Sequence, residues 1–578
     1  MSILNIFKEK TKWDKYYTKG EKENFELFKG TIYEMLLNTA LRTPLNRALS
    51  YYDSVYSYSE FLDKIDEVAA SLKALGLKKG DVISIIMPNT PEALATIYAS
   101  SKLGIIVSLM HPLSGEEEFK DSLINTGSKF LLAIDLIYNK LLNIINETSI
   151  EKVVLVSASK SMKWYYKAGY FVTKGYKVSK PKYNDLYISF DTFLKQGEGI
   201  LDIEKVESKS EDPAIILHSG GTTGKPKGIV LSNSNLSGMT NQFAYIFKYT
   251  PFEDANVVGK CLAILPIFHG FGLMASIHAP LTLGFEIMLM PQFDPKKFAK
   301  TFYKAKPSLL LGVPSLFDFI TKSRYLKNKD LSFLKLSIAG GDTLSPEMET
   351  TLNEFFIGHG SRPICAGYGL TEATAATITN ISVPHKLGTL GIPLYGNDFK
   401  ICVPGTLEEV APHETGEICI SGPTVMMGYL NNPKETNDTL QRHDNGRIYL
   451  HTGDLAYFDS DNYLVYVQRL KRMIITSGYN VYPSYIESIL SKHEAVSSVV
   501  VVGKKHKYKG EVVHAYIVLK EGYKETSRIK KELRALAEKN LAKYALPKDY
   551  HFRRSLPQTH MGKINYRELE EEEWNIYL

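Results

Sequence analysis

Helix-like and strand-like segments alternate along the first hundred residues, and this alternation constrains the fold more than any other feature of the sequence. Residues 59–75 place apolar side chains on one stripe of a helix, which Gly76 ends. The apolar run Val82–Met87 predicts a buried strand, residues 91–104 a second helix, and residues 105–110 the next strand. Such an order joins parallel strands through helices. We therefore expect an α/β fold here.

The pattern changes toward the C-terminus, where a smaller unit is expected. Residues 484–494 and 527–543 predict helices, and residues 497–505 and 514–520 predict strands. A chain of 578 residues is also too long for one core. We predict an α/β protein with a large N-terminal domain of several layers, residues 1–469, and a small α+β domain, residues 470–578.

Composition excludes several classes of protein. Hydrophobic residues make up 44% and charged residues 23%, which is a globular balance and not that of a disordered, collagen-like or coiled-coil chain. The net charge of +6 is weak for this length and does not argue for nucleic-acid binding. The four cysteines have neither a CxxC pair nor zinc-type spacing, and no secretory signal is visible. A reduced, cytoplasmic location is the expectation.

Two segments bear on contact with membranes. The run Cys261–Phe285 has no charged residue, but prolines and glycines such as Pro266 and Gly270 interrupt it, so we expect no membrane span. Residues 159–184 carry seven lysines and no acid, interleaved with Trp, Tyr and Phe. This insert fits a solvated basic loop. It also fits a surface patch that meets the inner face of a membrane, where aromatic residues enter the interface and lysines face anionic lipid.

A glycine-rich loop is the strongest chemical signal. The strand-like run Ala214–Leu217 leads into a loop of small, hydroxyl and basic residues: Ser219, Gly220, Gly221, Thr222, Thr223, Gly224, Lys225, Pro226, Lys227 and Gly228. Glycines let backbone amides approach an anion, hydroxyls donate hydrogen bonds, and lysines add positive charge. Pro226 stands where a Walker loop needs Ser or Thr to hold magnesium. The loop therefore indicates phosphate binding of another kind.

This loop resembles the signature of the adenylate-forming superfamily, which includes acyl- and aryl-CoA synthetases, firefly luciferases and nonribosomal-peptide adenylation domains. Five further segments match that superfamily in order, so that the resemblance covers about residues 30–572. They are LPIFHGFG (265–272), SIAGGDTLS (337–345), AGYGLTEA (366–373), HTGD with QRLKRMIITSGYN (451–480) and LPQTHMGKINYREL (556–569).

The resemblance implies roles for individual residues of the N-terminal part. His269 would lie between the acyl and ATP pockets, while Gly340 and Gly341 would lie against adenine. In the third segment, which also contributes Gly367 to the ATP site, Tyr368 would stack on adenine. Thr371 would bind phosphate, and Glu372 would hold Mg²⁺. Asp342 and Thr343 depart from the Ala-Pro that is frequent after these glycines.

The last two segments imply the remaining roles. Asp454 would accept both ribose hydroxyls beside Arg469, and Lys471 would be the hinge of the C-terminal domain. Gly478, Tyr479 and Asn480 would shape the CoA tunnel, and Lys563 would be the catalytic lysine. Ile475 departs from the lysine of plant aryl-CoA ligases and luciferases, which disfavours those two subfamilies.

The resemblance implies an ATP- and Mg²⁺-dependent ligase that activates a carboxylic acid as acyl-AMP and transfers it to CoA. The apolar residues around the motifs and the similarity of SGYNVYPSYIE to bacterial long-chain enzymes favour a medium- to long-chain fatty acid. Two alternatives stay open. One is a ligase for aryl or sterol-type acids, and the other is a fatty acyl-AMP ligase that loads a carrier protein.

Overall fold

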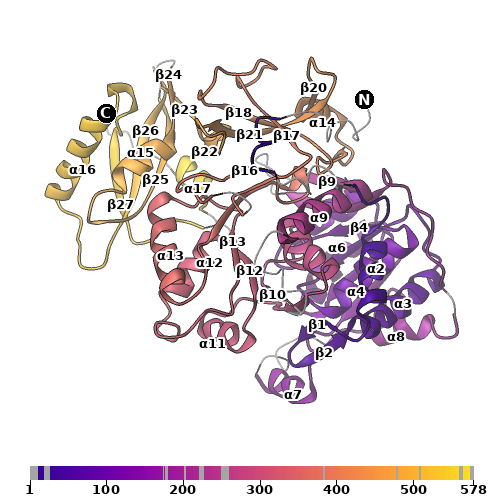
Figure 1. Cartoon of the computed structure of the whole chain (residues 1–578). Helices are drawn as coiled ribbons and strands as arrows, with labels where there is room; N and C mark the ends of the chain where they lie inside the picture. Colours follow the sequence, from indigo (N-terminus) through magenta and orange to yellow (C-terminus); the bar gives the residue numbers. More distant parts are fainter. Residues whose placement is uncertain are drawn as a thin grey trace. The chain divides into compact units, whose positions relative to one another are not determined.

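The computed structural model describes residues 11–17, 26–173, 175, 180–200, 203–219, 227–248, 259–381, 384–476, 479–506, 509–558 and 564–572. By packing, the chain divides into two compact units (Figure 1). The first contains Met1–Asp398 and Ile420–Leu450, and the second contains Phe399–Cys419 and His451–Leu578. Residues 399–419 and 451–469 thus pack with the C-terminal part, whereas the sequence analysis assigned them to the N-terminal domain, residues 1–469. That boundary stays a prediction.

The first sheet of the first unit realises the expected α/β alternation. Across the described ranges, its strands β8, β4, β3, β5, β6 and β7 run parallel; β9 pairs antiparallel with β8, and β19 pairs antiparallel with β9. In pairing order the strands are β19 (Gly428–Tyr429), β9 (Lys227–Ser232), β8 (Pro213–Ser219), β4 (Ile106–Leu109), β3 (Val82–Ile86), β5 (Phe130–Ile134), β6 (Lys152–Val156) and β7 (Tyr187–Ser189). The predicted strands at 82–87 and 105–110 are confirmed.

The second sheet of this unit has a parallel centre and antiparallel edges. In pairing order its strands within the described part of the chain are β16 (Ile392–Pro393), β15 (Ile378–Thr379), β14 (Cys365–Tyr368), β13 (Leu336–Ala339), β12 (Leu309–Gly312), β10 (Lys260–Ala263), β11 (Glu286–Leu289), β1 (Arg47–Tyr51) and β2 (Ser54–Ser57). Because β14, β13, β12 and β10 are parallel neighbours, their carboxyl ends lie at one edge.

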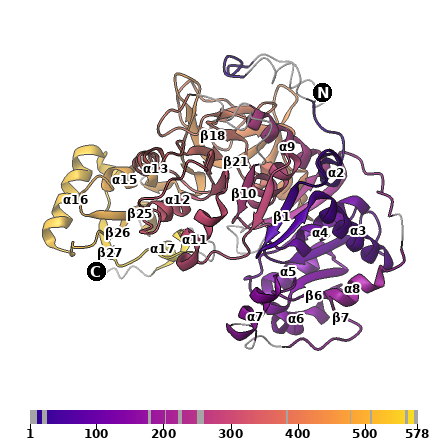
Figure 2. The same ribbon diagram turned by 60° about the horizontal axis from the view of Figure 1, so that its bottom comes forward.

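Helices pack on these sheets, and their ends follow local chemistry. The predicted helices appear as α3 and α4; Ser57 caps α3 in a capping box with Glu60, and Gly104 ends α4 with φ +68°. Figure 2 shows α3 beside α8. The helices are α2 (Ile32–Arg42), α3 (Tyr58–Ala74), α4 (Pro91–Leu103), α5 (Glu116–Thr126), α6 (Tyr138–Ile144), α7 (Trp164–Thr173), α8 (Phe190–Gln196), α9 (Asn233–Lys248), α10 (Ala279–Thr282), α11 (Pro295–Ala305), α12 (Pro314–Thr321), α13 (Pro346–Gly358) and α14 (Pro433–Thr439).

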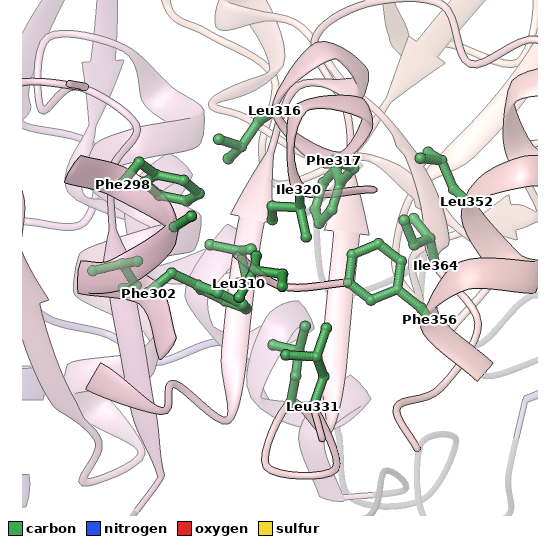
Figure 3. Packing of buried hydrophobic residues seen from close by; sticks show 14 of the residues in the cluster. Phe298, Phe302, Leu310, Leu316, Phe317, Ile320, Leu331, Leu352, Phe356 and Ile364 are labelled. Atoms are coloured by element: carbon green, nitrogen blue, oxygen red, sulfur yellow. The ribbon is translucent and has the colours of Figure 1, made fainter. Parts of the chain in front are cut away.

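An aromatic and aliphatic core holds helices α11, α12 and α13 against the second sheet. Phe302 of α11, Phe317 of α12 and Phe356 of α13 are fully buried, together with Leu310 of β12 (Figure 3). Burying side chains of this size stabilises the fold by about 1.5–3 kcal/mol each. This core fixes the strands whose ends carry three of the predicted motifs.

The uncharged segment Cys261–Phe285 becomes β10, the π-helix η5 (Phe271–His278) and the short helix α10. Prolines and glycines divide it, as the sequence predicted. Among the residues that the structure describes, no helix combines the length and the apolar character needed to cross a membrane.

The second unit contains two sheets. The first orders β17 (Asp398–Cys402), β18 (Gly416–Ser421), β21 (Ile448–Phe458) and β22 (Leu464–Arg469). Strand β20 (Leu440–Arg442) and the residues with which it pairs, Ile448–Leu450 of β21, belong to the first unit. The second contains β24 (Tyr479–Val481), β23 (Ile474–Thr476), β26 (Gly510–Leu519), β25 (Val496–His506) and β27 (Asp549–Arg553), with helices α15 (Pro483–Leu490), α16 (Ser527–Asn540) and α17 (Tyr566–Glu571). This α+β arrangement was predicted, although α15 ends four residues before the expected 494.

Candidate active site

Three predicted motifs lie at the carboxyl ends of parallel strands in the first unit. Residues 265–272 follow β10, Gly340 and Gly341 follow β13, and residues 369–373 follow β14. Ligands of open α/β sheets bind at this edge, because loops from several strands converge there. The structure thus brings together motifs that are separated by up to a hundred residues of sequence.

Glycines let the backbones of these motifs lie close to one another and to the residues that follow the third motif. A Cβ on Gly270 would lie 2.2 Å from the carbonyl oxygen of Thr374, and a Cβ on Gly369 would lie 1.5 Å from that of Ala375. A Cβ on Gly340 would lie 3.2 Å from the Gly367 oxygen. Contacts below 3.0 Å leave no room for a side chain, so the first two positions require glycine.

Thr374 adds backbone strain to the same loop. It has φ +69°, an uncommon conformation for a β-branched residue, and its side chain is fully buried. Its hydroxyl donates a hydrogen bond of 2.6 Å to the Thr424 carbonyl oxygen. Strained residues of this kind persist where the surroundings hold them and concentrate at functional sites.

His269 lies in the bend after β10, and Tyr368 lies at the end of β14. The His269 amide donates to the Pro266 oxygen at 3.1 Å, and its ring contacts the ring of Phe268. Tyr368 is the last residue of β14 and is largely buried. Thr371 and Glu372 follow in the 3₁₀ turn η6 (Thr371–Ala373).

A charged cluster connects the phosphate-loop segment to Glu372. The Tyr429 hydroxyl donates to Glu372 Oε1 at 3.1 Å, and the Lys227 ammonium lies 5.4 Å from the centre of the Tyr429 ring. Lys227 also forms an ion pair with Glu435. The sequence analysis missed Tyr429 and Glu435, because no local pattern connects them to residues far away in the chain.

The glycine-rich loop leaves the end of a strand. Ser219 is the last residue of β8 and pairs with Lys227 at the start of β9. The predicted residues Gly220, Gly221, Thr222, Thr223 and Gly224 lie outside the described residues. Next to the loop, burial lowers the pKa of His218 to about 4, and Nε2 of this neutral ring lies 2.9 Å from Ser108 Oγ.

The predicted ribose carboxylate has its basic partner in the second unit. Asp454 on β21 is 1% exposed, and its Oδ1 lies 2.9 Å from Nε of Arg469 on β22. The Tyr466 hydroxyl donates to the same oxygen at 3.4 Å. Burial and the Asp454 carboxylate raise the pKa of Tyr466, which keeps this hydroxyl protonated. A buried carboxylate needs such partners.

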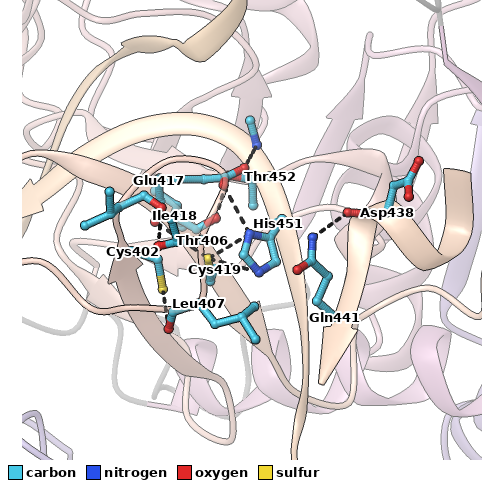
Figure 4. A network of polar contacts seen from close by, with 12 residues as sticks. Cys402, Thr406, Leu407, Glu417, Ile418, Cys419, Asp438, Gln441, His451 and Thr452 are labelled. Carbon is cyan, nitrogen blue, oxygen red and sulfur yellow. Dashed lines mark hydrogen bonds and ion pairs between the residues drawn. The ribbon is translucent and has the colours of Figure 1, made fainter. Parts of the chain in front are cut away.

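A polar network holds the part of β21 that precedes Asp454 (Figure 4). Oε1 of Glu417 accepts from the Gly453 amide at 2.8 Å, and its Oε2 lies 3.1 Å from His451 Nδ1. Thr452 donates to the Ile418 oxygen at 2.8 Å. Glu417, Cys419 and His451 offer donor atoms within 4.8 Å of one another, a set that a transition metal would accept. Their hydrogen bonds account for the burial without an ion.

The remaining predicted residues lie in the C-terminal part. Lys471 is exposed in the 3₁₀ turn Leu470–Arg472. In the next residue, Nη2 of Arg472 forms an ion pair of 2.5 Å with Oε1 of Glu487. Tyr479 and Asn480 lie on β24, paired with Thr476 and Ile475. Gly478 and Lys563 lie outside the described residues. Their roles stay predictions.

Comparison with known proteins shows to which family the chain belongs. Residues 36–430 match the AMP-binding enzyme family, and residues 485–563 match the AMP-binding enzyme C-terminal domain. A long-chain-fatty-acid–CoA ligase of Bacillus subtilis (strain 168) is 34% identical over 546 residues, 94% of each chain. A probable 4-coumarate–CoA ligase 1 of Dictyostelium discoideum is 32% identical over 524 residues, 89% of this chain and 90% of its own.

Solved structures share the fold. ATP-bound MatB from Rhodopseudomonas palustris superposes with a TM-score of 0.81 at 23% identity, covering 95% of this chain and all of its own. The o-succinylbenzoate CoA synthetase MenE of Bacillus subtilis, in complex with an acyl-adenylate, superposes with a TM-score of 0.74 at 25% identity, covering 95% and 99%. The chain belongs to the AMP-binding enzyme family and has the adenylate-forming fold.

Proposed function

We propose that this enzyme is an ATP-dependent acid–CoA ligase for medium- to long-chain fatty acids. One observation carries the choice of acid. The segments that converge at the carboxyl edge of the second sheet are apolar or small, with Phe271 and Met274 on η5 and with Ala339, Ala373 and Ala375 in or next to the other two motifs. Segments 265–278 and 337–341 contain no charged residue. Such surroundings favour a hydrocarbon chain.

Two further observations support a fatty acid. The Bacillus subtilis relative, similar over 94% of both chains, is named a long-chain-fatty-acid–CoA ligase. In addition, Ile475 stands where plant aryl-CoA ligases have a lysine. Nevertheless, the Dictyostelium relatives carry the name 4-coumarate–CoA ligase, which makes an aryl acid the second candidate.

The first half-reaction would form acyl-AMP. A carboxylate oxygen attacks the α-phosphorus of ATP, the bond from that phosphorus to the bridging oxygen breaks, and pyrophosphate leaves. Several negative groups meet in this step, so positioning and charge neutralisation carry the catalysis. We assign Lys563 to the space between carboxylate and α-phosphate, and residues 219–227 to the departing pyrophosphate.

Charge on pyrophosphate also calls for Mg²⁺, and Glu372 with Tyr429 fits this ion. A carboxylate is the ligand type that Mg²⁺ binds beside substrate phosphates. Tyr429 holds one carboxylate oxygen of Glu372, and the ammonium of Lys227 lies over the same tyrosine. The ion would neutralise phosphate charge, while Tyr429 orients the carboxylate.

The second half-reaction would transfer the acyl group. The CoA sulfur attacks the acyl carbonyl carbon as its thiol proton is lost, the bond to the AMP oxygen breaks, and AMP leaves. We assign Gly478, Tyr479 and Asn480 to the CoA tunnel and Lys471 to the hinge that exchanges this loop for Lys563. Asp454 and Arg469 would hold the ribose in both steps. One site then serves two transition states.

The four cysteines support a proposal for the cellular location. Cys261, Cys365, Cys402 and Cys419 are free thiols. Thiols of this kind persist in reducing compartments. We therefore place the enzyme in the cytoplasm.

The test presents the purified enzyme with ATP, Mg²⁺ and CoA to acids from acetate to oleate, with coumarate, benzoate and a bile acid included. Mass spectrometry measures acyl-AMP and acyl-CoA separately. We expect the amount of acyl-CoA formed to be greatest with medium- or long-chain fatty acids. A peak with coumarate or the bile acid would overturn the choice of acid. Accumulation of acyl-AMP without acyl-CoA would identify a carrier protein as the acceptor.

A further inference from the structure

Helix α7 (Trp164–Thr173) turns an apolar face to solvent at the periphery of the first unit (Figures 1 and 2). Trp164 is 77% exposed, Phe171 65% and Val172 73%. At 3.6 residues per turn these three residues and Ala168 share one face of the helix. Large aromatic side chains that gather on an exposed face mark an interaction surface rather than ordinary solvation.

Two neighbouring tyrosines anchor α7 and fix the direction of the apolar face: Tyr166 on the opposite side of the helix and Tyr165 at the edge of the face. The ring of Tyr166 packs on that of Tyr52 with centroids 5.2 Å apart, and the Tyr165 hydroxyl donates to Asp53 at 2.9 Å. Tyr52 and Asp53 form the tight turn between β1 and β2, both with positive φ. The helix therefore presents Trp164 and Phe171 outward from a rigid hairpin.

Positive charge borders this face. Lys163 and Lys167 are exposed on or next to the helix, and Lys180 and Lys182 follow it. Residues 159–184 contain no Asp or Glu. An exposed aromatic face with lysines and without acids is complementary to an anionic lipid surface, where rings enter the interfacial region and ammonium groups meet headgroups.

We propose that α7 docks the enzyme on anionic phospholipid membranes, with Trp164 and Phe171 inserted at the level of the headgroups and Lys163 and Lys167 at acidic lipids. Exposed lysines beside the aromatic face and the absence of acids from residues 159–184 favour an anionic surface over a single protein groove. This inference is independent of the proposed substrate, because binding is measured without acyl-CoA formation.

The test is co-sedimentation of the full chain with vesicles of phosphatidylcholine alone or mixed equally with phosphatidylglycerol. We expect binding to the mixed vesicles that weakens at high salt. Trp164→Ser with Phe171→Ser should weaken binding at least about tenfold. Lys163→Gln with Lys167→Gln should weaken it about 20- to 30-fold, since each lysine near such a surface contributes about fivefold.

Leu45→Ser with Ile357→Ser is the matched control, because these two side chains are 88% and 54% exposed elsewhere in the first unit. This pair should leave vesicle binding unchanged, and all variants should keep the melting temperature of the parent. Equal loss in the control and the α7 variants would overturn the proposal.

Fluorescence distinguishes docking through α7 from other causes of sedimentation. The emission of Trp164, obtained by subtracting the spectrum of Trp164→Phe, should shift to the blue on mixed vesicles. An unchanged Trp164 spectrum on sedimenting protein would contradict the proposal. Self-association without vesicles that Phe171→Ser abolishes would assign the face to a second copy instead. Binding of a single-stranded oligonucleotide through Lys163 and Lys167 would assign it to nucleic acid.

Discussion

The hydroxyl of Tyr429 donates a hydrogen bond to Oε1 of Glu372 at 3.1 Å, although the two residues are 57 positions apart in the sequence. Tyr429 also lies under the ammonium of Lys227, which pairs with Glu435. The tyrosine therefore joins the segment that follows the phosphate loop to the carboxylate proposed for Mg²⁺.

Tyr429→Phe should lower kcat/KM for acyl-AMP formation about tenfold, because a hydrogen bond to a charged group stabilises by about 1.5–3 kcal/mol. The Mg²⁺ concentration for half-maximal pyrophosphate release should rise at the same time. Tyr485→Phe, at a tyrosine that is 57% exposed, serves as the control. An unchanged Mg²⁺ dependence would remove Tyr429 from the proposed site.

Asp454→Asn should weaken recognition of the ribose. The carboxylate is buried beside Arg469 and has two acceptor oxygens for the two hydroxyls, whereas the uncharged amide has only one. KM for ATP should rise about tenfold or more. The decisive comparison uses 2′-deoxy-ATP: its disadvantage against ATP should shrink in the variant, as in a double-mutant cycle. The exposed Asp444→Asn is the control, and an undiminished discrimination would refute the assignment.

Gly369→Ala should disable the loop that carries Thr371 and Glu372. The new Cβ would lie 1.5 Å from the Ala375 oxygen, so the backbone must move. A displacement of about 1 Å can cost about a hundredfold in rate. Gly358→Ala meets nothing within 4 Å and should keep full activity. Pyrophosphate release measures both, and an active Gly369→Ala enzyme would show that the loop tolerates the shift.

Lys563→Ala and Lys471→Pro should separate the half-reactions. Loss of the lysine contact should slow acyl-AMP formation about 10²–10³-fold while thioester formation from supplied acyl-AMP continues. Proline at position 471 should restrict the hinge, so that thioester formation slows while acyl-AMP formation continues. The rate of acyl-AMP formation and the rate of thioester formation from supplied acyl-AMP are measured separately for each variant. Equal loss in both half-reactions for Lys563→Ala, or normal thioester formation in Lys471→Pro, would refute the respective role.

His278 should make the first unit less stable in acid. Its Nδ1 lies 2.8 Å from the Tyr98 hydroxyl, and burial lowers its pKa to about 3. Below pH 6.5 this histidine binds a proton in the unfolded chain, whereas in the native state it stays neutral down to its lowered pKa. The free energy of unfolding then falls by about 1.4 kcal/mol per pH unit until the native pKa is reached. Calorimetry at several pH values should find a smaller acid loss in His278→Gln. An equal loss would mean that His278 titrates normally.

The fold was predictable wherever the pattern is local. The apolar stripe of residues 59–75 and the run Val82–Met87 became α3 and β3 within one or two residues at each end. The end of α15 at Leu490 was missed, because the last predicted turn had no capping signal to oppose fraying. Packing also grouped residues 399–419 and 451–469 with the C-terminal part, which no local pattern records.

The sequence by itself determined the family motifs, the order of strands and helices along the chain, and the residues proposed for catalysis. Each of these features depends on a short run of consecutive residues. Only the tertiary structure decided that Tyr429 meets Glu372, that Gly270 lies against Thr374, and that α7 turns Trp164 outward. The physical reason is that these contacts join residues far apart in the chain, such as Tyr429 on β19 of the first sheet and Glu372 after β14 of the second. Packing of the folded chain sets such side-chain partners and the outward direction of a helix face, and spacing along the sequence does not.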